Sequence, residues 1–179
     1  MRRETPSYSS GTLSIDPIQP EDLPVFREML DELVDVLEMK DVYTIGDDAL
    51  YHALFDDPPG SEAIIARHKG EPAGIATWTD SFHLVRGKYT MLFDYIYVRP
   101  QFRNFMITPA MLIYLLMLAR RRGYFRMEGF VHEWNIETTN FYRALSAEEN
   151  TQQSFHIDLD KVDWAPFESV IGSHAPPQE

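Results

Sequence analysis

Hydrophobic and polar positions alternate along the chain with two periods, and each change of period marks a predicted element. Leu23, Phe26, Leu30 and Leu33 recur at intervals of three and four residues, which predicts a helix behind Pro20 with one apolar stripe. Shorter apolar or alternating runs predict strands. The predicted order is β-α-α-β-β-β-α-β-α-β, with elements at 12–18, 20–37, 47–55, 63–67, 73–79, 89–98, 109–122, 124–132, 137–145 and 154–159.

Turn residues separate these elements. The breaker Asp56–Gly60 ends the second helix, and His68–Glu71 joins two short strands. A loop is expected at Asp80–Lys88 and a turn at Pro100–Thr108. Because helices and strands alternate, the fold class is predicted to be α/β, with a mixed central sheet covered by helices on both faces.

Chain length and composition set the expected domain organisation. A chain of 179 residues with 44% hydrophobic residues predicts one domain at 12–164, with flexible polar tails at 1–11 and 165–179. The absence of cysteine excludes disulfides and thiol nucleophiles. The six histidines lack the spacing of metal ligands, so no metal site is expected.

The charge balance narrows the class of partner. The formal net charge of −12 argues against general nucleic-acid binding and suits a cationic small molecule, although it serves solubility equally well. The longest apolar run, near 110–119, is about half of a membrane span, so no membrane partner is expected. No apolar run follows the first arginines as in a signal peptide, and a cytoplasmic location is predicted.

Positive charge is concentrated in one segment. Between Asp94 and Glu128 the sequence contains six arginines and no acidic residue. The segment is predicted to form a strand, a turn and a helix, with Thr108 as the N-cap and Pro109 as the first helical residue. A helix N-terminus reached in this way is a ready anion site.

The six arginines divide into groups by their place along this segment. Arg99 and Arg103 flank the turn, where a phosphate would lie. Arg120, Arg121 and Arg122 lie at the far end of the helix, where cations suit the dipole and a surface role is expected.

Two motifs carry a resemblance to a known family. The segment FDYIYVRPQFRNFMITPAMLIYLLMLARRRG and the later HEWNIETTNFYRALSA resemble the GCN5-related N-acetyltransferase (GNAT) superfamily. The hairpin GIATWTDSF, with Trp134, Asn135, Phe141 and Tyr142, is most similar to the diamine (spermidine/spermine and thialysine) acetyltransferase branch. The resemblance implies the GNAT fold, acetyl-CoA as the acyl donor, a small-molecule amine acceptor and a homodimer.

Two residues are candidates for the chemistry. A protonated amine must lose a proton before it attacks a thioester, and Asp94 stands where the branch has a glutamate base, so contact through a water is expected. Tyr142 matches the family's general acid, which protonates the departing thiolate. The alternatives are a buried aspartate capped by backbone donors and an aromatic residue that packs in the core.

The resemblance also implies a donor site with one departure from the family pattern. The family signature Arg/Gln-x-x-Gly-x-Gly/Ala falls on Arg103–Thr108, so Met106 and Thr108 replace both glycines, and Pro109 removes a backbone donor. Asn135 matches a donor-contacting asparagine, with a turn residue as the alternative. The predicted donor-contacting residues are Ile96, Val98, Arg103, Asn104, Phe105, Met106, Ile107, Thr108 and Asn135.

The acceptor site is predicted from charge and aromatic character. Trp78 and Asp80 on the hairpin, with Asp35 and Glu38 at the end of the first helix, could bind a cationic amine. Each of the four is an ordinary surface residue in the alternative interpretation.

The altered turn leaves two further hypotheses open. The same acyl transfer could use another donor, either a carrier-protein thioester or an aminoacyl-tRNA ester. The chain could instead be a catalytically silent member of the fold that acts by binding or regulation. Asp94 and Tyr142 favour an enzyme, whereas the loss of both glycines favours the silent protein.

Overall fold

The computed structural model describes residues 4–131, 136–144 and 147–149. The chain divides into two compact units, Met1–His132 and Glu133–Glu179. The first unit contains a six-stranded sheet with its covering helices, and the second contains helix α4 (Ile136–Ala144). The strand predicted at 154–159 lies outside the described residues.

The sheet has the strand order β1-β2-β3-β4-β5-β6, so neighbours in sequence are neighbours in space. All neighbouring pairs are antiparallel except β5 and β6, which are parallel and are connected through a helix. The strands are β1 (Tyr8–Ser10), β2 (Leu13–Pro17), β3 (Glu62–His68), β4 (Glu71–His83), β5 (Lys88–Val98) and β6 (Arg126–Gly129).

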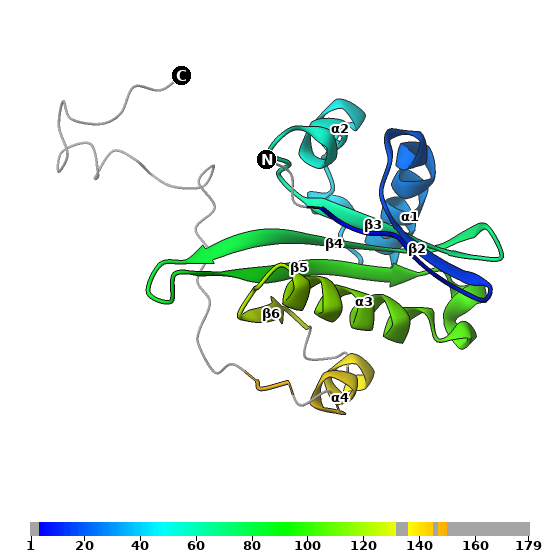
Figure 1. Cartoon of the computed structure of the whole chain (residues 1–179). Coiled ribbons are helices and arrows are strands. Elements are labelled where there is room, and N and C mark those ends of the chain that lie inside the picture. Colours follow the sequence, from blue (N-terminus) through cyan, green and yellow to red (C-terminus); the bar gives the residue numbers. More distant parts are fainter. Residues whose placement is uncertain (1–3, 132–135, 145–146, 150–179) are drawn as a thin grey trace, which may run out of the picture. The chain divides into compact units, whose positions relative to one another are not determined.

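Helices cover both faces of this sheet, which confirms the predicted fold class. Figure 1 shows α1 (Leu23–Val36) and α2 (Asp47–Phe55) on one face and α3 (Ile107–Arg121) on the other. Short 3-10 helices η1 (Pro20–Asp22), η2 (Lys40–Val42) and η3 (Pro100–Phe105) join these elements. The core beneath α1 and α2 contains Ile18, Phe26, Met29, Leu33, Leu50, Leu54, Ala63, Ile65, Ile75 and Tyr97.

Most predicted elements are present, although the bounds of several differ. Helix α2 has the predicted bounds. The predicted loop 80–88 is too long: it covers only 84–87, because β4 continues to His83 and residues 80–83 pair with β5. Strand β6 covers only Arg126–Gly129, whereas the predicted strand was 124–132. The segment 1–11, predicted to be a tail, contains β1, which pairs with β2 through Tyr8↔Ile15.

Arg122 corrects the prediction of a surface role at the end of α3. Its side chain is only 5% exposed and forms a two-pronged ion pair with Glu62 of β3, at 2.6 and 2.7 Å. The guanidinium also donates to the hydroxyl of Thr5 (2.7 Å) and lies over the indole of Trp78, 5.9 Å from the ring centroid. The residue ends α3 directly beneath the sheet, so its side chain cannot reach solvent as that of Arg121 does.

Candidate active site

A β-bulge in β5 presents Asp94. Trp78 of β4 pairs with Phe93, whereas the preceding Thr77 pairs with Tyr95, so Asp94 is the extra residue. A bulge of this kind interrupts the ladder and redirects a side chain, and bulges are frequent next to active sites. The bulge is not among the predicted features, although an acidic residue inside the apolar run of β5 was a signal for it.

The opposite edge of β5 opens at the same point. Parallel pairing with β6 ends at Phe93↔Gly129, one residue before Asp94. The ring of Phe93 lies so close over Gly129 that a Cβ there would be 2.0 Å from it. Within the described part of the chain, β5 from Asp94 to Val98 therefore pairs on its β4 side only. Such an edge can accept an extended ligand through backbone hydrogen bonds.

Asp94 is exposed, in contrast to the alternative of a buried and capped aspartate. Partial burial nevertheless raises the pKa of its carboxyl above the ordinary aspartate value. A raised pKa makes the carboxylate a stronger base than a fully solvated one. Asp94 therefore combines access to a ligand with the character that a general base requires.

The turn after β5 takes a conformation that usually requires glycine. Residues 100–105 form η3, and Met106 then adopts the left-handed region with φ 55° and ψ 25°. The Met106 carbonyl accepts the first helical bond from the Ala110 N–H (3.1 Å). Helix α3 therefore begins at Ile107, and the prediction of Thr108 as its N-cap is wrong. Met106 thus keeps the backbone shape of a glycine turn without the glycine.

The start of α3 retains part of an anion cradle. The first N–H groups of a helix have no intrahelical partner, and here they belong to Ile107 and Thr108, since Pro109 carries none. The Met106 side chain is 69% exposed and Ile107 is buried. Arg103 lies beside the turn, where its Nε donates to the Val98 carbonyl (3.3 Å). These groups could bind a diphosphate. Because of Pro109, the start of α3 provides one backbone donor fewer than a helix without proline at that position.

Two other predicted donor residues lie on the outer side of this turn. Asn104 and Phe105 are both exposed. The Phe105 ring stacks on His68 with centroids 4.4 Å apart. Ile96 is half-buried and Val98 is buried, both on the strand that leads into the turn.

Arg99 belongs to a different network from the one predicted. It pairs with Glu32 (2.8 Å) and Glu28 (3.1 Å) of α1, so it does not flank a phosphate alongside Arg103. The hydroxyl of Tyr97 donates to the other oxygen of Glu32 (2.9 Å). Burial, followed by this hydrogen bond, raises the pKa of Tyr97 to about 12. The network joins the open half of β5 to α1 and fixes its position.

The four predicted acceptor residues lie in different local contacts. Trp78 is fully buried, because its ring packs toward α3 near Arg122, and it cannot face a ligand as predicted. The Asp80 carboxylate accepts a hydrogen bond from Tyr124. Asp35 pairs with Lys40 (2.8 Å) at the end of α1, and Glu38 is exposed with φ 54°.

Tyr142 lies on α4 in the second unit. Burial raises the pKa of its phenol to about 12, so the hydroxyl stays protonated at neutral pH and retains a proton to donate. Asn135 lies outside the described residues.

The described residues contain neither a metal-ligand cluster nor a membrane-spanning helix. Among them, no group of three or more histidine, aspartate or glutamate side chains is placed to hold a metal ion. Their helices include none that is both long and apolar enough to cross a membrane.

Comparison with known proteins gives the family. The family model described as "Acetyltransferase (GNAT) family" matches residues 26–146, which is more than half of the chain. The chain therefore belongs to this family and is an acetyltransferase of the GNAT class. A search of curated proteins found no match.

Solved structures of acetyltransferases share the fold. An aminoglycoside acetyltransferase from an uncultured soil metagenomic sample has a TM-score of 0.70 at 17% identity, covering 82% of this chain and 96% of that chain. A ribosomal-protein-alanine N-acetyltransferase from Brucella melitensis biovar Abortus 2308 has a TM-score of 0.66 at 21% identity, covering 82% and 99%. A possible acetyltransferase from Clostridium difficile 630 has a TM-score of 0.69 at 13% identity, covering 83% and 99%.

The left-handed Met106 gives a test of the turn. Met106→Gly should tighten the binding of coenzyme A roughly tenfold, about the value of one charge-assisted hydrogen bond, because the diphosphate can then approach the backbone. Stability should change by no more than about 1 kcal/mol, since relief of the left-handed strain offsets the added flexibility of the unfolded chain. Calorimetric titration and thermal denaturation measure the two effects.

The matched control is Met117→Gly, which places the same change at an exposed position in the middle of α3. It should lower stability by about 1 kcal/mol and leave coenzyme A affinity unaltered. Equal affinities of the wild type and Met106→Gly would mean that the turn does not contact the diphosphate.

Proposed function

We propose that the protein transfers an acetyl group from acetyl-CoA to the primary amine of a small, cationic acceptor, with Asp94 as the general base. The observation that carries this proposal is the bulge at Asp94, which coincides with the open edge of β5. One strand thus offers a carboxylate and, beside it, a backbone edge that pairs with no strand among the described residues. Together they suit an amine on one side and an extended thioester on the other.

The donor is proposed from two features of the first unit. The open edge from Asp94 to Val98 can bind an extended arm that carries amide groups, and it leads directly into η3 and α3. At that end, Arg103 and the N–H groups of Ile107 and Thr108 suit a diphosphate. The order amide arm, then diphosphate, is the order of these groups in coenzyme A.

The proposed chemistry requires two proton transfers by the protein. A bound acyl thioester supplies the electrophilic carbonyl carbon and the sulfur leaving group. Asp94 accepts a proton from the acceptor ammonium, directly or through a water, so that the nitrogen can form the new N–C bond. Tyr142 donates its phenolic proton to the sulfur as the C–S bond breaks, and the second proton that the nitrogen loses as the amide forms returns, through water, to the Tyr142 oxygen. One proton is released overall, and Asp94 passes it to solvent.

The acceptor is proposed to be cationic because of the acidic side chains of α1. Glu28 contacts Arg99, and Glu32, one turn later in α1, contacts both Arg99 and the earlier β5 residue Tyr97. Higher residue numbers in α1 therefore lie beside lower residue numbers in β5, so the two elements run in opposite directions. One further helical turn, about 6 Å, brings Asp35 toward Tyr95, since two strand residues span a similar length. We infer that Asp35 and Glu38 attract the amine, whereas the buried Trp78 does not contact it.

Calorimetric titration with acetyl-CoA tests the donor. A dissociation constant in the micromolar range is expected. Absence of binding at millimolar acetyl-CoA would exclude this donor, and the same titration with an acetylated carrier protein then tests the alternative. The missing N–H of Pro109 is the observation that favours that alternative, because a carrier-borne thioester presents no diphosphate of this kind at α3.

Tyr142→Phe tests the proposed acid. We expect a loss of about 10² to 10⁴ in kcat, the usual contribution of a general acid, with little change in the affinity for acetyl-CoA. The control is Tyr51→Phe, which removes a hydroxyl from an exposed tyrosine of α2. Equal kcat values for Tyr142→Phe and the wild type would discard the assignment.

A further inference from the structure

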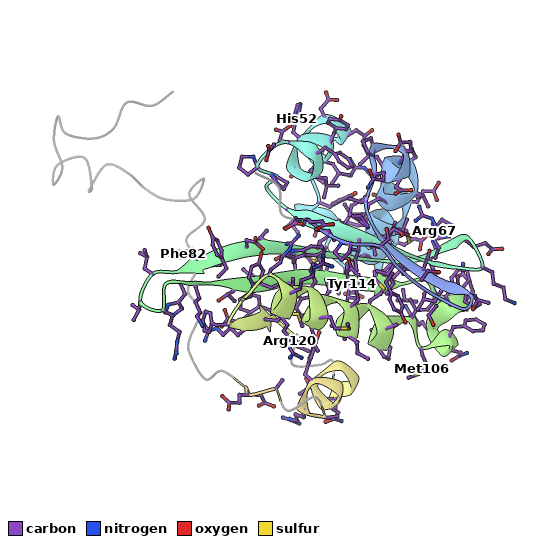
Figure 2. All side chains as sticks on the ribbon, in the orientation of Figure 1. His52, Arg67, Phe82, Met106, Tyr114 and Arg120 are labelled. Carbon is purple, nitrogen blue, oxygen red and sulfur yellow. The ribbon has the colours of Figure 1, made fainter. Side chains whose placement is uncertain are left out.

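A recess of about 320 Å³ lies at the end of the β4–β5 hairpin, away from the open edge of β5. Its outer wall is apolar and consists of Phe82, Leu84 and Val85 from the hairpin tip. Leu84 and Val85 are 85% and 92% exposed, so two neighbouring aliphatic side chains stand in solvent. Adjacent exposed apolar side chains often mark a binding surface. Figure 2 labels Phe82 on this hairpin. The wall can therefore cover an apolar group of a ligand.

The inner side of the recess carries polar groups that are shielded from solvent. Thr90 lines it and is only 2% exposed. His83 also lines it, and its buried Nδ1 has no hydrogen-bond partner in the part of the chain that the structure describes. A buried polar atom without a partner is costly, so this nitrogen calls for a ligand or water group.

The rim of the recess is electrically neutral. Arg126 and Glu128 of β6 both line it and form an ion pair of 2.6 Å. The Arg126 guanidinium also lies 4.8 Å from the centroid of the Phe125 ring. Because Arg126 and Glu128 neutralise each other, the rim favours an uncharged ligand group that can donate or accept hydrogen bonds.

The recess and Tyr95, the residue that follows the bulged Asp94, share one face of the sheet. Thr90 pairs with Ser81 and Tyr95 pairs with Thr77, and residues 77 and 81 of β4 point to the same face because they are four apart. Thr90 and Tyr95 are five residues apart on β5, but the extra residue of the bulge at Asp94 keeps their side chains on the same face. Four strand residues, from Thr77 to Ser81, span about 13 Å, so the near end of the recess lies about this far from the bulge.

A continuous strip of accessible side chains joins the two places. Thr77, Thr79 and Leu92 are half-buried, and Ser81 and Tyr95 are exposed. They lie on the same face, that of α1 and α2, because Thr77 also pairs with Ala63 of the core beneath those helices. A ligand bound at Asp94 can thus extend along hydroxyl-bearing residues into the recess.

We propose that the recess is a distal subsite for the acceptor, a deduction that rests on the proposed function. The acceptor carries a primary amine at Asp94 and, at least about 13 Å away, an uncharged apolar group with an adjacent hydrogen-bond donor. An extended peptide with an apolar fifth residue has this chemistry, as does an elongated small amine with a terminal amide. The apolar group packs on Leu84 and Val85, and the donor meets Nδ1 of His83.

Acceptor length provides the test. Acetyl transfer is measured for alaninamide, for the pentapeptide amides Ala-Gly-Gly-Gly-Leu and Ala-Gly-Gly-Gly-Ser, and for a long alkylamine with a terminal amide. The leucine pentapeptide should have a KM about tenfold below those of alaninamide and the serine peptide. A low KM for the leucine peptide alone identifies a peptide, and a low KM for the alkylamine alone identifies a small molecule. Equal KM values for all four would overturn the subsite.

Variants show whether the recess causes the preference. Val85→Asp should remove the tenfold advantage of the long acceptor and leave kcat with alaninamide unchanged. Met117→Asp, an equally drastic change at an exposed position of α3, should preserve the advantage. If Val85→Asp keeps the advantage, the recess is not the subsite.

The proposed function can fail independently of the subsite. Failure of the wild type to acetylate any amine would contradict the proposed function. Calorimetric binding of the long acceptors then decides the recess: weaker binding to Val85→Asp than to Met117→Asp supports it, and equal binding overturns it.

Discussion

Replacing Asp94 by asparagine is expected to lower kcat/KM by about 10² to 10⁴, the usual contribution of a general base. The asparagine side chain has nearly the same size but cannot accept the ammonium proton. Steady-state kinetics with a saturating acetyl donor measure the loss. Asp48→Asn, an exposed carboxylate at the start of α2, is the control and should retain full activity.

The same Asp94→Asn substitution should not lower the stability of the folded protein, although it lowers the activity. Partial burial raises the folded pKa of Asp94, so the ionised form is less favourable in the folded protein than in the unfolded chain. Above the folded pKa this carboxylate therefore opposes folding, and below the unfolded pKa its effect vanishes. At neutral pH, Asp94→Asn should have an unchanged or higher midpoint of thermal denaturation. A large fall in both stability and activity would mean that Asp94 is structural.

The pH dependence follows from the same shift. The acid limb of kcat/KM should lie above the ordinary aspartate range, because the base must be ionised and its pKa is raised. Since the phenol of Tyr142 has a pKa of about 12, it should cause no loss of activity between neutrality and about pH 10. If the acid limb is absent from the pH profile of Asp94→Asn, the Asp94 carboxyl is the group whose ionisation produces it.

Replacing Arg122 by methionine is expected to lower the free energy of unfolding by about 3 to 5 kcal/mol, the usual cost of removing one partner from a buried ion pair. Glu62, whose side chain is 12% exposed, would be left as an uncompensated charge beneath the sheet. The contact with Thr5 in the N-terminal segment would be lost as well. Denaturant titration gives the difference directly.

Two companion variants make this experiment specific. Arg121→Met changes the neighbouring arginine, whose side chain is 60% exposed, and should alter stability by no more than about 0.5 kcal/mol. The double variant Arg122→Met/Glu62→Met removes both charges and should recover a substantial part of the loss. Equal effects of Arg121→Met and Arg122→Met would show that the buried pair contributes nothing particular.

The architecture was largely predictable because it rests on local patterns. The stripe on α1, the breaker behind α2 and the apolar run of β5 each determine an element without knowledge of its neighbours. The extent of β4 was not predictable, because three of the four residues from Asp80 to His83 are polar and the segment is held in the sheet by its pairing with β5. Strand β1 likewise depends on pairing with β2.

The site residues show the same division. Asp94 was found as an acid inside an apolar strand, yet its exposure depends on a bulge that only pairing with β4 reveals. Arg99 and Arg122 appeared equivalent to other arginines in the sequence. Their roles are determined by Glu28, Glu32 and Glu62, which are distant in the chain. Long-range ion pairs leave no periodic signal.

The most direct measurement is mass-spectrometric detection of acetyl transfer from acetyl-CoA to a panel of primary amines, with the wild type and Asp94→Asn compared side by side. The panel contains diamines, peptide amides and an aminoglycoside. We predict that the wild type forms an N-acetylated product with at least one cationic amine, at a rate at least about a hundredfold above that of Asp94→Asn. Equal rates for the two proteins, or no product from any amine, would contradict the proposed function.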